Sequence, residues 1–171
     1  NVIKRDIFKH LENKKEAYTT LYWAKPEDLK NQYKKITYNK IFEPYNLVIG
    51  TGEYLDDFEE NTKTKILDYI SSIRYDKNDY IFVVDNEGVY LSHIEKSYVG
   101  LNRINLKDPN GFMITKEIIN GARDGNSAYL EYVGTIKPQT KLPSRKITYV
   151  KGFKDWNWAI ASVNYTNKRK K

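Results

Sequence analysis

Residues 80–93, with the sequence YIFVVDNEGVYLSH, are the stretch that decides the fold. Residues 80–85 are β-branched or aromatic up to a closing aspartate, a composition typical of a strand. Residues 86–88 supply a turn in which Gly88 can adopt a positive φ. Residues 89–93 then return as the partner strand. The sequence therefore predicts a β-hairpin at this point.

The elements around this hairpin follow an α+β pattern. A helix is predicted over residues 55–74, where acidic side chains crowd the first turns and isoleucines recur at helical spacing. A short helix is predicted over residues 113–122, and three more strands over 128–133, 145–151 and 156–165. We therefore expect an α+β fold built on a five-stranded antiparallel sheet flanked by helices.

An internal repeat divides the chain. The sequence KITY occurs at residues 35–38 and again at 146–149, an offset of 111 residues. At this offset residues 2–54 match residues 113–165 with 14 identities in 53 positions. The repeat predicts three parts in chain order: the back half of a truncated module (1–54), a complete module with its leading helix (55–165) and a basic tail (166–171).

The composition argues against several classes of function. The chain has no cysteine and two histidines, so we expect no metal site and no cofactor. Ser92 and His93 are neighbours on a predicted strand and point to opposite faces, so they cannot form a catalytic dyad there. Residues 50–52 (GTG) lack the third glycine of a dinucleotide-binding loop. We therefore expect a protein module that is not an enzyme and has no catalytic residues.

The net charge of +7 leaves one alternative open. Lysine and arginine total 29 against 22 acidic residues, and four of the cations are residues 168–171. Fifteen tyrosines with excess lysine are compatible with a stacking, cationic surface for nucleic acid. Acidic residues interleave the lysines, however, so nucleic-acid binding stays a lesser alternative and no nucleic-acid partner is expected.

An ordered series of short motifs resembles a known family. Together the motifs look like the Cache sensor domains, of the Cache_2 type, from bacterial transmembrane receptors. The motifs that carry this resemblance are 49–56 (IGTGEYLD), 80–88 (YIFVVDNEG), 91–93 (LSH), Tyr132, Lys137-Pro138, 146–149 (KITY), Phe153, 156–158 (WNW) and Tyr165.

The resemblance implies a place for each part of the chain. In a double-Cache receptor two PAS-like modules stack outside the membrane, so residues 1–54 would belong to the membrane-distal module and 55–165 would be the membrane-proximal one. The tail would lead towards a membrane helix beyond this chain, because no apolar run here is long enough to span a bilayer. The chain is then expected to be the periplasmic or extracytoplasmic part of a bacterial inner-membrane protein.

The resemblance also implies a sensory function. A small polar molecule such as a carboxylate or an amino acid would bind and be relayed to a chemoreceptor, sensor histidine kinase or cyclic-dinucleotide output. A homodimer is expected. A ligand-free module that serves as a structural spacer or dimer contact stays open as an alternative.

The candidate ligand-binding residues follow from what a buried carboxylate requires, namely charge-assisted and phenolic donors. Strand alternation places Lys146 and Thr148 on one face and Tyr149 on the other, which argues against one pocket for both Lys146 and Tyr149. One departure from the repeat lies nearby, because Gly134 stands where the first copy has Trp23. The candidates are Arg74, Tyr80, His93, Tyr132, Lys146 and Tyr149.

Overall fold

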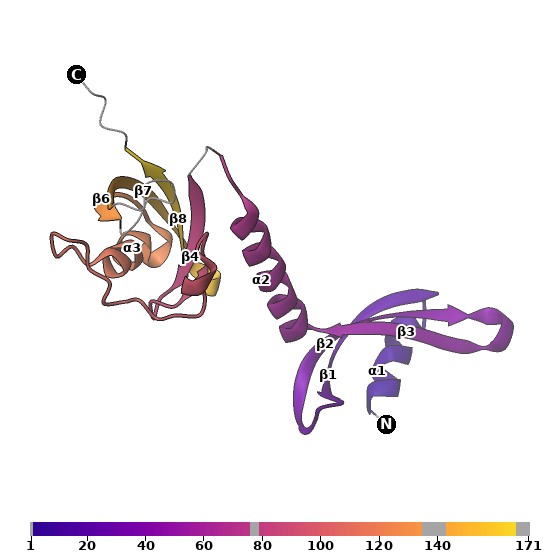
Figure 1. The fold of residues 1–171 in the computed structure, drawn as a ribbon. Helices are drawn as coiled ribbons and strands as arrows, with labels where there is room; N and C mark the ends of the chain where they lie inside the picture. The colour runs from indigo at the N-terminus through magenta and orange to yellow at the C-terminus, as the bar shows by residue number, and fades with distance from the viewer. Residues whose placement is uncertain (1, 76–78, 135–142, 167–171) are drawn as a thin grey trace. The chain divides into compact units, whose positions relative to one another are not determined.

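The chain forms two compact units, Asn1–Thr64 and Lys65–Lys171, which we describe separately as unit 1 and unit 2. The computed structural model describes residues 2–75, 79–134 and 143–166, and Figure 1 labels their helices and strands. The Lys137-Pro138 motif lies outside the described residues, as does the expected basic tail except for Thr166.

Unit 1 is a three-stranded antiparallel meander with a short helix. Its elements in chain order are α1 (Val2–Leu11), β1 (Glu16–Lys25), β2 (Asp28–Phe42) and β3 (Leu47–Tyr54). The strands lie in the order β1-β2-β3, so in the described part of the chain β3 pairs with β2 alone. Leu11 at the end of α1 is 4% exposed and is a core residue of this unit.

The boundary between the two compact units falls inside helix α2 (Leu55–Ser72), after Thr64. An ion-pair cluster attaches the first turn of α2 to unit 1. Lys25 at the end of β1 is 8% exposed, and its ammonium lies 2.6 Å from a carboxylate oxygen of Asp56 and 2.5 Å from one of Asp57. These two carboxylates also lie in the first turn, where the helix dipole favours negative charge.

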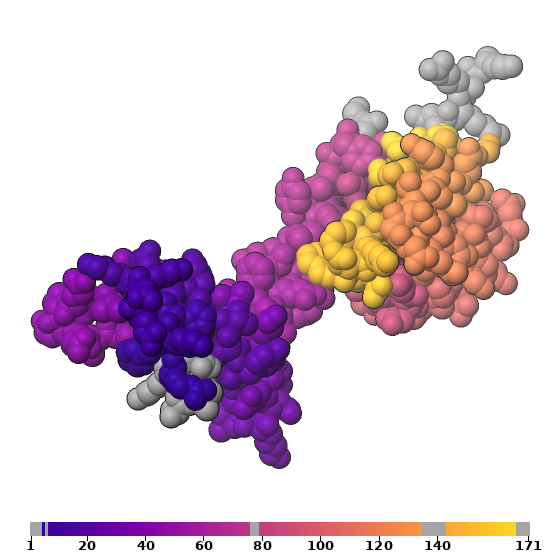
Figure 2. All heavy atoms as spheres, turned by 180° about the vertical axis from the view of Figure 1, so that it is seen from behind, coloured from indigo at the N-terminus to yellow at the C-terminus, as the bar shows by residue number. Residues whose placement is uncertain are grey.

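Unit 2 contains the predicted five-stranded sheet, which confirms the α+β fold. Its strands are β4 (Tyr80–Asp85), β5 (Tyr90–Ser92), β6 (Ser127–Gly134), β7 (Ser144–Phe153) and β8 (Trp158–Tyr165), in the order β5-β4-β8-β7-β6. All neighbours pair antiparallel. In Figure 2 the yellow residues near the C-terminal end of the described chain lie against the orange residues that precede them, and β8 pairs with β7. The hairpin at residues 80–93 is therefore confirmed as β4–β5.

Element ends differ slightly from the sequence-based expectation. Helix α2 ends at Ser72 and not at residue 74. Strand β8 begins at Trp158 and not at residue 156, because residues Lys154–Trp156 form a 3₁₀ turn. Asn157 closes that turn in the left-handed region, at φ 54° and ψ 39°, which an asparagine tolerates better than most residues.

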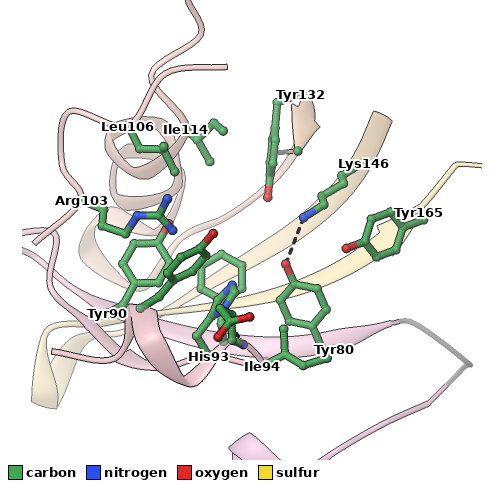
Figure 3. A pocket seen from close by; sticks show the side chains of 14 residues that line it. Tyr80, Tyr90, His93, Ile94, Arg103, Leu106, Ile114, Tyr132, Lys146 and Tyr165 are labelled. Atoms are coloured by element: carbon green, nitrogen blue, oxygen red, sulfur yellow. Dashed lines mark hydrogen bonds between the residues drawn. The ribbon is translucent and has the colours of Figure 1, made fainter. Parts of the chain in front are cut away.

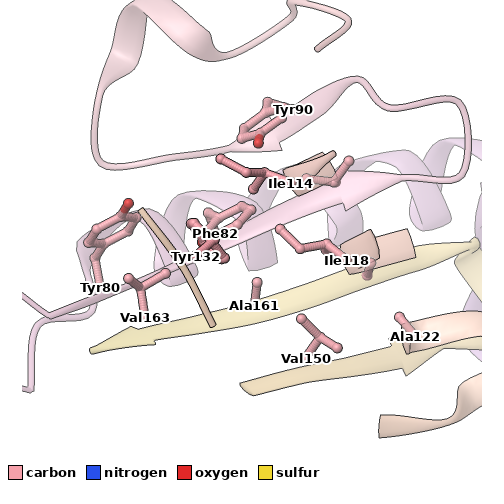
Figure 4. Close-up of a cluster of buried hydrophobic side chains, with 12 residues drawn as sticks. Tyr80, Phe82, Tyr90, Ile114, Ile118, Ala122, Tyr132, Val150, Ala161 and Val163 are labelled. Carbon is pink, nitrogen blue, oxygen red and sulfur yellow. The ribbon is translucent and has the colours of Figure 1, made fainter. Parts of the chain in front are cut away.

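Helices cover both faces of the sheet. Helix α3 (Ile114–Ala122) packs Ile114 and Ile118 against one face, where Phe82, Val150 and Ala161 are 2% exposed or less (Figure 4). On the other face a smaller cluster unites Ile70 of α2 with Val83 and Trp158. Polar groups are buried on the α3 face beside the apolar core, so this is the face on which a ligand-binding site is considered below.

The internal repeat is also a structural repeat. Strands β1-β2-β3 reproduce the order and register of β6-β7-β8. Tyr18 faces Tyr38 with ring centroids 5.1 Å apart, and their counterparts Tyr129 and Tyr149 are 5.0 Å apart. Asn46 closes a 3₁₀ turn at φ 50°, as Asn157 does in unit 2. The sequence offset of 111 residues therefore has a conformational counterpart at several independent points.

Candidate ligand-binding site

A cavity of about 450 Å³ lies within unit 2, between the α3 face of the sheet and the loop that connects β5 to α3. All five strands of the sheet, the loop and helix α3 contribute residues to its lining (Figure 3). The residues used below are Tyr80 of β4, Tyr132 of β6, Lys146 of β7, Tyr165 of β8, and Arg103 and Leu106 of the loop.

Lys146 places a buried ammonium in this cavity. The residue is 5% exposed, and its Nζ donates a hydrogen bond of 3.1 Å to the phenol oxygen of Tyr80. The Nζ also lies 4.9 Å from the centroid of the Tyr165 ring. Among the described residues no ion pair joins Lys146 to an acidic side chain. Burial, and secondarily the charge of Arg103, lower the pKa of Lys146 to about 8.

Gly134 makes room for the lysine. A Cβ atom at this position would lie 2.1 Å from Cε and 2.5 Å from Cδ of Lys146. Any side chain here would therefore push the ammonium away from its present place. Gly134 is the position at which the repeat in unit 1 carries Trp23, so this departure from the repeat is what allows the lysine to lie as it does.

Arg103 supplies a second cation from the loop. Its guanidinium lies 3.7 Å from the ring centroid of Tyr98 and 5.4 Å from that of Tyr90, in cation–π contact with both. The side chain is half-buried, and no ion pair with an acidic side chain is found for it in the described part of the chain. The cavity therefore presents two positive groups held by aromatic rings.

His93 is a neutral donor in this setting. It is 7% exposed and packed among four aromatic rings, those of Tyr80, Phe82, Tyr90 and Tyr98. Burial, followed by the charge of Lys146, lowers its pKa to about 3. Its Nδ1 accepts a hydrogen bond of 2.9 Å from the backbone N–H of Glu95, so the proton of the neutral ring lies on Nε2. His93 thus offers an N–H group without a change of charge near neutral pH.

The tyrosines supply phenols that stay protonated. Burial raises the pKa of Tyr80 and of Tyr132 well above the ordinary value. The Tyr132 oxygen accepts a hydrogen bond of 2.9 Å from the hydroxyl of Thr148. Because the Tyr132 oxygen already accepts this bond, Tyr132 can direct its own proton towards a ligand, whereas the Tyr80 phenol is hydrogen-bonded to Tyr165 as well as to Lys146.

The structure brings four of the six predicted residues together. Tyr80, His93, Tyr132 and Lys146 all line the cavity. The other two candidates, Arg74 and Tyr149, do not line it. Arg74 is exposed beyond the end of α2 and donates to the carbonyl oxygens of Ser71 and Ile73. Tyr149 is 37% exposed and lies against its cross-strand partner Tyr129, with the rings tilted by 50°, on the sheet face opposite the cavity, as strand alternation requires.

Sequence reasoning missed other lining residues. Arg103, Tyr98 and Leu106 lie on an irregular segment whose place cannot be read from periodicity. Tyr165 carried a usable signal, because the repeat pairs it with Tyr54. In unit 1 the ammonium of Lys35, the counterpart of Lys146, lies 4.3 Å from the Tyr54 ring centroid, so the lysine–tyrosine contact is repeated as well.

The described residues lack both a cluster of metal ligands and a helix suited to a bilayer. They contain no group of three or more histidine, cysteine, aspartate or glutamate residues arranged to hold a metal ion. In the same part of the chain, no helix combines the length and apolar character that crossing a membrane requires.

Comparison with solved structures identifies the architecture. A Cache chemosensory domain, solved to explain carboxylic acid recognition, aligns with a TM-score of 0.59 and 28% identity over 63% of this chain and 74% of the other. A periplasmic sensor domain of a chemotaxis protein aligns with a TM-score of 0.59 and 26% identity over 63% of this chain and 75% of the other. The fold is therefore that of Cache sensor domains.

Comparison with curated proteins agrees. The sensor histidine kinase MctS of Rhizobium johnstonii is 29% identical over 108 residues, which are 63% of this chain and 23% of the kinase. The methyl-accepting chemotaxis protein McpP of Pseudomonas putida is 27% identical over 109 residues, 63% of this chain and 20% of the receptor. The similarity thus spans about a fifth to a quarter of these much longer relatives.

A family match covers nearly the whole sequence. Residues 1–169 match the Cache domain family model, dCache_2, in agreement with the sensory relatives and with the fold of unit 2. The chain belongs to the Cache domain family of sensor domains.

Proposed function

We propose that the cavity of unit 2 binds a small carboxylate that has no amino group. The carrying observation is the ammonium of Lys146, which is 5% exposed and has no acidic partner among the described residues. A buried cation without a counterion is costly, and an anionic ligand would supply the missing charge. Arg103, the Nε2–H of His93 and the phenol of Tyr132 are the further donors that a carboxylate would meet.

The charges of the cavity favour a carboxylate over an amino acid. An α-ammonium group needs an acceptor of negative charge, and here it would lie beside Lys146 and Arg103. Among the described residues that line the cavity, the acid is Glu95, which is exposed and whose carboxylate accepts bonds from Ser97. A volume of about 450 Å³ is sufficient for a small organic acid.

The experiment compares matched pairs of ligands by thermal shift: acetate with glycine, propionate with alanine, and succinate with aspartate. Each pair differs by one amino group. We expect at least one acid to raise the melting temperature of the wild-type chain, its amino acid partner to have a smaller effect, and Lys146→Met to abolish the difference. Stabilisation by none of the acids, or equal stabilisation of the Lys146→Met variant, would refute the proposal and would favour the alternative of a ligand-free structural or dimer-forming module.

We infer further that the chain is the extracytoplasmic sensing part of a bacterial membrane receptor. In this proposal residues 1–54 are the second half of a membrane-distal Cache module, and residues 55–165 are the membrane-proximal module. Ligand binding would favour one arrangement of the module, and the change would reach a membrane helix beyond this chain. The sensory relatives support this assignment, and a homodimer is part of it; sedimentation with and without ligand would test the dimer.

A further inference from the structure

A loop that crosses the sheet covers one side of the cavity. We call residues 100–112 the strap. It connects β5 to α3 and carries Arg103 and Leu106, both of which line the cavity. Because β5 and β6 are the two opposite edges of the five-stranded sheet, a segment attached to both closes over everything between them.

The strap is attached to the β5 edge by backbone hydrogen bonds. The N–H of Gly100 donates to the carbonyl of Tyr90 at 2.8 Å, and the N–H of Tyr90 donates to the carbonyl of Leu101 at 3.1 Å. The N–H of Arg103 donates to the carbonyl of Gly88 at 2.8 Å. This end therefore behaves as an extension of the β4–β5 hairpin and does not depend on a particular side chain.

The attachment at the β6 edge is different, because one carboxylate makes it. Asp108 is 6% exposed. Its Oδ1 accepts bonds from the N–H groups of Asn110 at 2.7 Å and Phe112 at 2.9 Å, which form the turn of the strap itself. Its Oδ2 accepts a bond of 3.1 Å from the N–H of Val133 on β6. The two oxygens thus have separate tasks, one within the strap and one between the strap and the sheet.

The Asp108–Val133 bond lies beside the cavity wall. Tyr132, the neighbour of Val133, lines the cavity and also lines a surface hollow shared with Asp108, Phe112 and Val133. The Phe112 ring stacks on that of Tyr132 with centroids 6.1 Å apart. Loss of the bond would let the strap move away from β6 at the point where Tyr132 lines both the cavity and the surface hollow.

We propose that Asp108 is a positioning residue for ligand binding, which holds the strap over the cavity through its bond to Val133 and so keeps Arg103 and Leu106 above Lys146. The inference rests on the proposed function of the cavity, but it concerns a contact that exists without ligand. Asp108 touches no cavity-bound molecule in this proposal and acts only through the strap.

Asp108→Asn tests the bond that joins strap and sheet. The amide oxygen can keep both bonds of the turn, whereas the amide NH₂ group cannot accept from Val133. Val133→Pro removes the other partner of the same bond, and β6 is an edge strand in which the Val133 N–H points away from its neighbour, so a proline there leaves the ladder intact. Asp85→Asn is the matched control, because Asp85 accepts turn N–H groups of Glu87 and Val89 in the same way at a distance from the cavity.

The readout is the rate at which Lys146 reacts with an amine-acylating reagent, followed by mass spectrometry on the ligand-free protein. We expect the reaction rate of Lys146 to increase roughly tenfold in both Asp108→Asn and Val133→Pro, because each change removes one hydrogen bond to a charged group. The double variant should react no faster than either single one. Asp85→Asn should match the wild type, and Lys25, buried in unit 1, should keep its rate in every variant.

The outcomes separate this inference from the proposed function. Wild-type rates at Lys146 in both Asp108→Asn and Val133→Pro would overturn the role of Asp108, whether or not a carboxylate binds. An equal increase at Lys146 and Lys25 would also overturn it, because that pattern means general destabilisation. A faster reaction at Lys146 alone would support the role of Asp108 even if no acid in the panel stabilised the wild-type chain, a result that would refute only the proposed ligand.

Discussion

Replacing Lys146 by methionine should stabilise unit 2 at neutral pH while it removes the proposed ligand site. The pKa of Lys146 falls from 10.5 to about 8 on folding. Below pH 8 the charged lysine therefore lowers the free energy of unfolding by about 3 kcal/mol. Loss of the hydrogen bond to Tyr80 offsets about 1 kcal/mol of the gain. We therefore expect the variant to be about 2 kcal/mol more stable than the wild type at pH 7.

The sign of the effect should reverse at alkaline pH. Between pH 8 and 10.5 the unfolded chain still holds a proton on Lys146 that the folded chain has released, so the free energy of unfolding of the wild type rises with pH over this window. Lys146→Met cannot show this rise. Its advantage should shrink by about 3 kcal/mol and become a deficit of about 1 kcal/mol near pH 10.5.

The assay is urea unfolding followed by tryptophan fluorescence at a series of pH values. A Trp23→Phe background leaves Trp156 and Trp158 as the fluorophores, so the signal reports unit 2. Lys116→Met, a change at an exposed position on α3, is the control and should show a difference from wild type that does not vary with pH. A flat difference between Lys146→Met and wild type across the same range would refute the claim that Lys146 is buried as an unpaired charge.

Three further predictions concern the pH dependence of binding, Gly134 and the turn at Asn157. Affinity for a carboxylate should be constant below pH 8 and fall about tenfold per pH unit above it, because binding at the higher pH requires Lys146 to take up a proton. Calorimetry in buffers of different ionisation enthalpy would detect that uptake, and an affinity that does not vary with pH would contradict it. Gly134→Ala should abolish carboxylate binding, since its Cβ would occupy the path of the lysine chain, and unchanged binding by calorimetry would show that the lysine position is not needed. Asn157→Ala should lower the free energy of unfolding by about 1 kcal/mol while Asn157→Gly is neutral, because alanine disfavours φ 54°; equal effects of the two changes in urea unfolding would argue against a conformational cause.

The sequence predicted the parts of the fold that local pattern controls. The hairpin at residues 80–93 has strong strand composition and a glycine turn, and it forms as expected. Strand alternation placed Lys146 and Tyr149 on opposite faces, and the structure agrees: one is 5% exposed and the other 37%. The repeat predicted the matching conformations of the two copies, because the same residues meet the same cross-strand partners.

The rest depended on contacts that no local pattern carries. Arg103 enters the cavity because backbone bonds to Gly88 and Tyr90 fix the strap on the β5 edge. The apolar residues of α2 that pack on the sheet end at Ile70. Arg74 lies beyond them and outside the site. The role of Asp108 was hidden for the same reason, because its bond partner Val133 lies 25 positions away in the sequence.

The most direct test of the account is the pKa of Lys146 measured in the folded protein, by NMR of the labelled lysine side chain, with and without the acid that most stabilises the wild-type chain. We expect a pKa near 8 in the free protein and an increase of about 2 pH units when the carboxylate is bound, because the anion supplies the negative charge that the cavity lacks. A value near 10.5 in the free protein, or one that binding leaves unchanged, would contradict it.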